Sequence, residues 1–167
     1  MELQILFWIF PFSMIVAGVR DTLTYSIPNW ISLLLFCAFI GCGLINQVHW
    51  SLFAEHFVCG FTILVVSICA FALNWMGGGD AKLLAAAALW IGFDHLLPFL
   101  FWTAMLGGLL ALAILIYRSV LPPVWVLGQS WAKRLHDPKE GIPYGVAIAG
   151  GGLLVYPQTI WMTGIAS

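Results

Sequence analysis

Long runs of apolar residues, separated by short polar groups, divide the chain into six stretches of helical character. Crossing the hydrocarbon core of a bilayer, which is about 30 Å thick, takes about 20 apolar residues in an α-helix. Runs near that length, bounded by charges or by Pro and Gly, therefore predict membrane-spanning helices. The stretches are Leu3–Val19, Ile27–Ile45, Leu52–Leu73, two parts of Leu83–Tyr117, and Val146–Met162. The pattern predicts an all-α, polytopic membrane protein with about six transmembrane helices.

The fourth run, Leu83–Tyr117, is too long for one span, and we expect two antiparallel helices. Three residues are expected to divide it: Asp94, His95 and Pro98. Its first part, Leu83–Phe93, has eleven residues, which span only about 17 Å. This helix must therefore extend backwards through Gly77–Gly79, or meet a recessed, water-filled entrance. The last stretch contains Gly150–Gly152, which should let neighbouring helices approach closely.

Composition agrees with a membrane protein. Hydrophobic residues make up 62% of the chain and charged residues 8%, and the mean hydropathy is +1.02, whereas soluble domains carry about 25% charged residues. A water-soluble fold and intrinsic disorder are therefore excluded. The net charge of −1 and the lack of a basic run exclude a nucleic-acid partner. The four cysteines lie in apolar runs without a C-x-x-C pair, which predicts small hydrophobic side chains and no disulfide framework or zinc site.

The positions of the charged residues predict the orientation of the chain in the membrane. If six spans alternate, all six cations fall on one side, which the positive-inside rule makes cytoplasmic. They are Arg20, Lys82, Arg118, Lys133, Arg134 and Lys139. Both termini are then expected on the non-cytoplasmic side, with an uncleaved first span. The loop Arg118–Ile142 predicts a helix at headgroup level, which serves as a cationic anchor or positions a membrane-bound substrate.

Two acids stand out among the seven. Asp21 and Asp80 lie at the predicted cytoplasmic ends of the first and fourth spans, far apart in sequence but at the same depth. Ionisable groups near spanning helices are costly, so a functional role is the first hypothesis. Three consecutive glycines, Gly77–Gly79, precede Asp80 and leave room for an extended backbone beside it.

Two carboxyl groups in a poorly solvated site tend to share one proton, so that one is an acid and the other a base. Such a pair can activate water against an amide carbonyl. The sequence contains no G-x-S-x-G motif and gives no support for a metal site. From the residues alone, Asp21 and Asp80 are either a catalytic pair or two helix-end acids. The alternatives are a small transporter or proton channel lined by these carboxylates, and a non-catalytic membrane assembly factor.

Three segments together resemble the type IV prepilin peptidases, the bacterial G-x-G-D aspartic proteases. They are Gly77–Leu84, the segment from Asp21 to Asn29, and Ile142–Gly145, which looks like the I-P-x-G-P segment opening the family's last helix. The third match departs from the pattern at Val146, where the family often has proline. Spread over almost the whole chain, these matches imply one membrane-embedded peptidase domain, residues 1–167.

The resemblance implies removal of the leader from prepilin or pseudopilin precursors at the cytoplasmic face of a bacterial inner membrane. It implies Asp21 and Asp80 as the catalytic pair and no cofactor. Substrate contacts are expected at Gly77, Gly78 and Gly79, and at Lys82, which either tunes the pair or marks the membrane boundary. The chain lacks the paired C-x-x-C region of larger members, so no N-methyltransferase activity is expected. Its small size is similar to the TadV/CpaA-type peptidases of Flp pilus systems.

Overall fold

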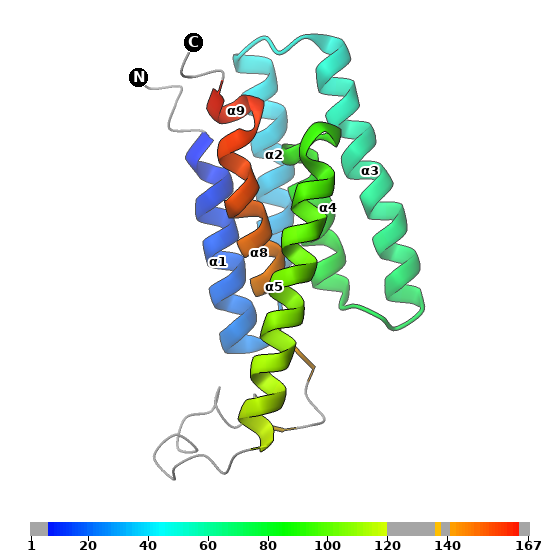
Figure 1. The fold of residues 1–167 in the computed structure, drawn as a ribbon. Coiled ribbons are helices and arrows are strands. Elements are labelled where there is room, and N and C mark those ends of the chain that lie inside the picture. The colour runs from blue at the N-terminus through cyan, green and yellow to red at the C-terminus, as the bar shows by residue number, and fades with distance from the viewer. Residues whose placement is uncertain (1–6, 120–135, 138–140, 164–167) are drawn as a thin grey trace.

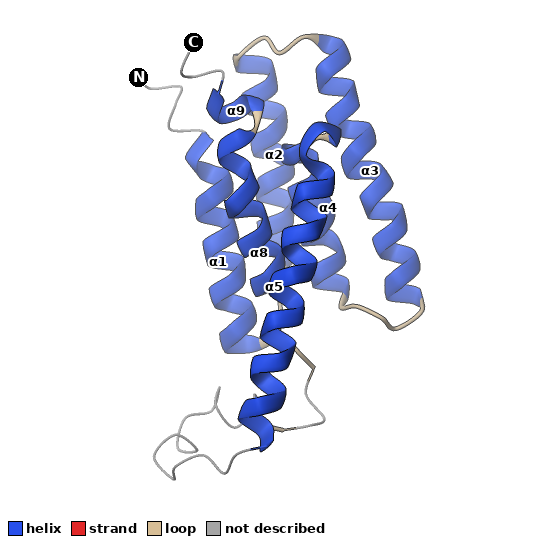
Figure 2. Cartoon of the chain, viewed as in Figure 1, coloured by secondary structure: helices blue, strands red, loops and turns tan. Residues whose placement is uncertain are grey.

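The computed structural model describes residues 7–119, 136–137 and 141–163, which form a bundle of α-helices (Figures 1 and 2). The helices are α1 (Ile9–Thr24), α2 (Asn29–Ile45), α3 (Trp50–Ala72), α4 (Gly78–Ile91), α5 (Phe93–Ser119) and α8 (Gly145–Val155), followed by a 3₁₀ turn, η2 (Tyr156–Gln158), and α9 (Ile160–Thr163). Within the described ranges there is no strand. The prediction of an all-α fold is confirmed for these residues.

Two helices, α3 and α5, are long and apolar enough to cross a membrane. Large hydrophobic side chains are exposed along both of them, for example Phe61 and Val66 of α3 and Leu109 of α5. Such a surface suits contact with lipid rather than with water. The number of six spans and the side that the termini face stay predictions. The predicted headgroup-level helix falls mainly on residues 120–135 and 138–140, which lie outside the described residues.

Helices α4 and α8 occupy the centre of the bundle. Helix α4 packs against α2, α3, α5 and α8, and α8 packs against α1 and α5. In Figure 1, α1 and α8 run side by side, and α3 lies on the far side of α4. Both α1 and α4 thus pack against α8, and Phe10 of α1 also contacts Trp90 of α4, with ring centroids 5.7 Å apart.

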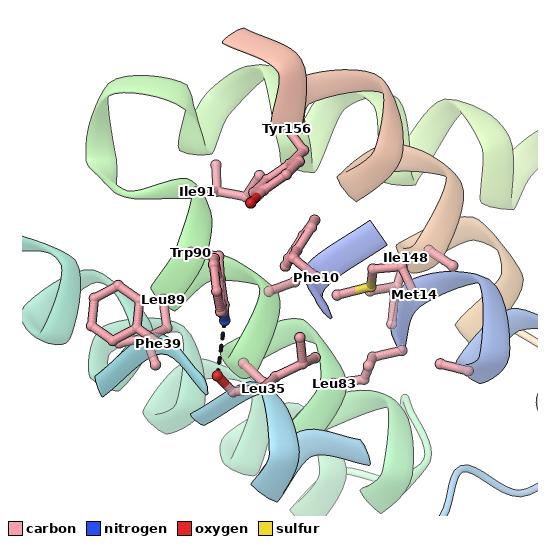
Figure 3. Close-up of a cluster of buried hydrophobic side chains, with 14 of the residues drawn as sticks. Phe10, Met14, Leu35, Phe39, Leu83, Leu89, Trp90, Ile91, Ile148 and Tyr156 are labelled. Carbon is pink, nitrogen blue, oxygen red and sulfur yellow. Dashed lines mark hydrogen bonds between the residues drawn. The ribbon is translucent and has the colours of Figure 1, made fainter. Parts of the chain in front are cut away.

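Aromatic side chains fill the core where α1, α2, α4 and the α8–α9 segment meet (Figure 3). Trp90 is fully buried, and its indole Nε1–H donates a hydrogen bond of 2.9 Å to the carbonyl of Leu35. The carbonyl of Trp90 accepts a hydrogen bond of 2.8 Å from Nε1–H of Trp161. Because a buried polar group without a partner costs free energy, these bonds are what allow indoles in the core.

The break between α4 and α5 lies at Gly92, so the expected division at Asp94–Pro98 is wrong. Gly92 has φ 73°, a conformation that favours glycine, and a Cβ atom built there would lie 2.8 Å from Nε2 of His56. Asp94 and Pro98 lie inside α5. The other end of α4 follows the prediction of a backward extension, since the helix begins at Gly78.

Glycines of α8 allow α5 to pack closely against it, as the sequence predicts. A Cβ atom built at Gly151 would lie 2.9 Å from the backbone nitrogen of Thr103. We expect Gly151→Ala to lower the free energy of unfolding by about 1–3 kcal/mol, because neither backbone can yield without loss of packing. Thermal unfolding in detergent measures this. The matched control is Gly108→Ala on α5, where a Cβ atom meets nothing within 4 Å. Equal stability of the two variants would contradict the close α5–α8 contact.

Candidate active site

Three helix ends meet at one end of the bundle. The last turn of α1 carries Asp21 and the first turn of α4 carries Asp80. Figure 1 shows these two ends at the lower end of the bundle, toward which the N-terminus of α8 also points. Both acids lie outside the apolar stretches predicted to cross the membrane. The structure therefore brings the two predicted carboxylates to the same end of the molecule.

Asp21 is held by the N-terminus of α8. Its side chain is 5% exposed, and its Oδ2 accepts a hydrogen bond of 2.7 Å from the backbone N–H of Gly145. The backbone N–H of Val146, which donates to the carbonyl of Pro143, also lies near enough to lower the pKa of Asp21. The first N–H groups of a helix have no partner within the helix, and its dipole favours a negative charge there. Helix α8 thus holds the position of Asp21 and favours its charged form, against the effect of burial.

The absence of a side chain at residue 145 is what permits this contact. A Cβ atom built on Gly145 would lie 2.8 Å from Oδ2 of Asp21 and 2.6 Å from Cδ1 of Ile27. Ile27 in turn lies against α4, because a Cβ atom built on Gly79 would be 3.2 Å from Cβ of Ile27. The side chain of Ile27 thus joins the starts of α4 and α8 beside Asp21.

Asp80 lines a cavity of about 730 Å³. The cavity is bounded by the α3–α4 connection, the end of α5 and the segment before α8. Its other lining residues are Ala70, Asn74, Trp75, Met76, Gly77, Arg118, Gly141, Ile142 and Tyr144. A water-accessible carboxyl beside a space of this size can meet a peptide segment of a substrate.

The charge of Asp21 acts on Asp80. Burial, followed by the nearby charge of Asp21, raises the pKa of Asp80 to about 6, against a smaller opposite effect of the Gly77 backbone. Burial also raises the pKa of Asp21, while the N–H groups of Gly145 and Val146 lower it in part. Hydrogen bonds to a carboxylate favour its ionised form. The environment therefore favours a pair in which Asp80 carries the proton and Asp21 the charge.

The three glycines predicted to be site residues lie in different surroundings. Gly77 lines the Asp80 cavity, and a Cβ atom there would lie 2.9 Å from Oδ2 of Asp80. Gly78 faces the ring of Phe71, with a built Cβ at 3.3 Å, and Gly79 faces Ile27. These two glycines therefore allow close packing of α4 in the structure.

Lys82 lies apart from the Asp80 cavity. Its Nζ donates a hydrogen bond of 2.9 Å to Oδ1 of Asn29, and it lines a different groove. Asn29 is the first residue of α2. The structure thus groups Asp21, Asp80 and Gly77, and places Lys82 on another face of α4.

Sequence reasoning missed Gly145 as the partner of Asp21. The sequence feature that pointed to this region was the Ile142–Gly145 segment. It predicts the start of a helix but not that this helix start binds Asp21. Among the residues that the structure describes, no group of three His, Cys, Asp or Glu side chains could hold a metal ion.

Comparison with known proteins agrees with these motifs. The model of a family described as the type IV leader peptidase family matches residues 8–112. The chain belongs to this family. A prepilin leader peptidase/N-methyltransferase from Bacillus subtilis (strain 168) is 30% identical over 145 residues, which are 86% of this chain and 51% of the relative. The chain thus spans about half the length of the curated relative that it matches. No solved structure matches it.

Membership of the type IV leader peptidase family confirms the resemblance deduced from the motifs. The matched residues 8–112 include Asp21, Asp80 and the three glycines before Asp80. They end within α5, so Gly145 lies beyond the family match. The contact of Gly145 with Asp21 is therefore information that comes from the structure.

Proposed function

We propose that this chain is a membrane aspartic endopeptidase that removes the leader peptide of prepilin or pseudopilin precursors, with Asp21 and Asp80 as its acid–base pair. The observation that supports the proposal is that these two acids, from distant parts of the chain, lie at the same end of the bundle, near enough for the charge of Asp21 to raise the pKa of Asp80, which lines a cavity. The family supports the substrate class, and the electrostatics support one shared proton.

The proposed reaction begins with a water molecule between the carboxyl groups. Ionised Asp21 takes a proton from the water molecule, and the water oxygen attacks the scissile carbonyl carbon. At the same time Asp80 gives its proton to the carbonyl oxygen. Asp21 then passes its proton to the leaving nitrogen as the C–N bond breaks, and Asp80 recovers a proton from the intermediate. Water is consumed, and the pair returns to its starting state.

The distribution of charge supports a site at the cytoplasmic face. Arg20, Lys82 and Arg118 lie at the same end of the bundle as the acids, near the end of α1, the start of α4 and the end of α5. Glu55 and Asp94 lie near the starts of α3 and α5, at the opposite end. The positive-inside rule makes the first end cytoplasmic. A precursor whose hydrophobic helix lies in the bilayer would present its leader there, in the bacterial inner membrane.

Substrate contacts are proposed at the walls of the Asp80 cavity. Gly77 leaves the backbone beside Asp80 uncovered, so an extended peptide can approach the carboxyl. Contacts from Gly78, Gly79 and Lys82 stay predictions. We propose leader removal without N-methylation and a place among the small peptidases of Flp pilus systems.

The test is direct cleavage. Purified protein in detergent is incubated with a prepilin encoded in the same genome, and mass spectrometry follows the substrate. We expect a product shorter by the leader, cut just before the hydrophobic helix. Intact substrate, together with proton flux through the protein in liposomes, would favour the transporter instead.

The reaction should depend on pH through the shared proton. Because the pKa of Asp80 is raised to about 6, Asp80 holds its proton below that pH and loses it above. We expect kcat/KM to fall above about pH 6, toward tenfold per pH unit, since this ratio reports the free enzyme. Initial rates of leader removal between about pH 4 and pH 9 measure it.

The control for this profile is unfolding temperature at each pH. A carboxyl with a raised pKa binds more protons in the folded state, so its contribution to stability decreases as the pH rises from about 4 to 6. The fold must persist across the range for the rates to be compared. A constant kcat/KM up to about pH 8 in folded protein would contradict the assignment of the proton to Asp80.

A further inference from the structure

A second groove lies between α2, α3 and α4, and it shares no lining residue with the Asp80 cavity. Its volume is about 220 Å³. The groove wall includes carbon atoms of Phe36, Phe57, Phe61 and Leu89, and its polar liners are Ser32 and Lys82. The proposed acid–base chemistry uses none of these six residues, and of the six only Lys82 is also a predicted substrate contact.

The polar liners leave one charge and one hydroxyl uncompensated. Nζ of Lys82 donates to Oδ1 of Asn29, a neutral amide oxygen, at 2.9 Å. Oγ of Ser32 is buried and has no hydrogen-bond partner in the described part of the chain. No carboxylate lines the groove. An ammonium group with two further protons and a hydroxyl at one end of a groove suit an anionic oxygen ligand.

The groove changes from polar to apolar along the bundle axis. Helices α2 and α4 both begin at the lower end of the bundle in Figure 1. Ser32 and Lys82 lie near these starts, whereas Phe36 and Leu89 lie one to two turns deeper. Leu89 lies seven positions after Lys82, which corresponds to about 10 Å along the helix. The groove thus has a charged end at the membrane surface and an apolar end toward the hydrocarbon.

We propose that this groove binds an anionic phospholipid, with its phosphate at Lys82 and Ser32 and one acyl chain along Phe36, Phe57 and Leu89. A positive residue beside the cytoplasmic leaflet attracts anionic headgroups. A helical partner fits less well, because a helix is about 10 Å across with its side chains and would need several times the volume of the groove. The bound lipid would join α2, α3 and α4.

Lipid titration of the purified full chain in detergent tests the site. Native mass spectrometry counts bound phosphatidylglycerol, and phosphatidylcholine with the same acyl chains is the neutral comparison. We expect preferential binding of phosphatidylglycerol. Lys82→Gln should weaken it by about fivefold, the factor for one cation near an anionic headgroup, and Lys82→Arg should retain most of it. Glycerol phosphate, which has no acyl chains, should not compete.

The matched control is Arg20→Gln, an exposed cation at the same end of the bundle that does not line the groove. It should bind phosphatidylglycerol as the unchanged protein does. Equal binding of the two lipids, or full binding by folded Lys82→Gln protein, would overturn the proposal. Equal losses in the Lys82 and Arg20 variants would overturn it too, because they would indicate general surface charge. These outcomes do not depend on peptidase activity.

Discussion

Asp21→Asn and Asp80→Asn are each expected to abolish leader removal, lowering kcat/KM by about 10³-fold or more. Positioned acid–base groups contribute roughly 10²–10⁴-fold in enzymes, and here each variant removes one half of the pair. Asn at 21 cannot accept a proton from water, and Asn at 80 cannot supply one to the carbonyl oxygen. Mass spectrometry of a prepilin incubated with each purified variant measures the loss.

The control for these variants is Asp94→Asn. Asp94 is an exposed acid near the start of α5, at the other end of the bundle. The Asp94→Asn protein should cleave the prepilin at the normal rate. All three variants should unfold near the unfolding temperature of the unchanged protein. Normal leader removal by folded Asp21→Asn or Asp80→Asn protein would refute the proposed mechanism.

Gly145→Ala should be the next most damaging change. Its Cβ would lie 2.8 Å from Oδ2 of Asp21 and 2.6 Å from Cδ1 of Ile27, so α8 must move away and the 2.7 Å hydrogen bond to Asp21 must lengthen. We expect a decrease in kcat/KM of about 10²-fold, the scale of a misplacement of about 1 Å in a catalytic site. Initial rates on a prepilin measure it.

A pH profile separates this effect from simple loss of structure. When the N–H of residue 145 moves away from Asp21, the charged form of Asp21 is less favoured and its pKa rises. The acidic side of the kcat/KM profile should therefore move to higher pH. Gly41→Ala is the control, because a Cβ atom there meets nothing within 4 Å. A Gly145→Ala protein that loses activity with an unchanged profile would show that the contact does not tune Asp21.

The sequence predicted the helical fold and the end of the bundle at which the two acids lie. Both conclusions depend on apolar run length and charge, which act locally and leave a clear pattern. The break at Gly92 was missed because a single glycine in an apolar run looks like the packing glycines of α8. Only its positive φ and the adjacent ring of His56 distinguish it.

Contacts between distant segments were harder to predict. The bond from Gly145 to Asp21 joins residues 124 positions apart, and a backbone donor leaves no side-chain signature. Lys82 shows a different difficulty. It is two residues from Asp80, and residues two apart on a helix do not face each other. Because Lys82 is close to Asp80 in sequence, a shared site was expected. The helix geometry instead places the two side chains on different faces of α4.

The most direct test of the shared catalytic water is an experimental structure with a bound substrate peptide whose scissile carbonyl is replaced by a hydroxyl-bearing carbon. The account predicts that one hydroxyl oxygen lies within about 2.6–3.2 Å of carboxyl oxygens from both Asp21 and Asp80. A bound peptide whose hydroxyl contacts one carboxyl while the other faces a different surface would contradict it.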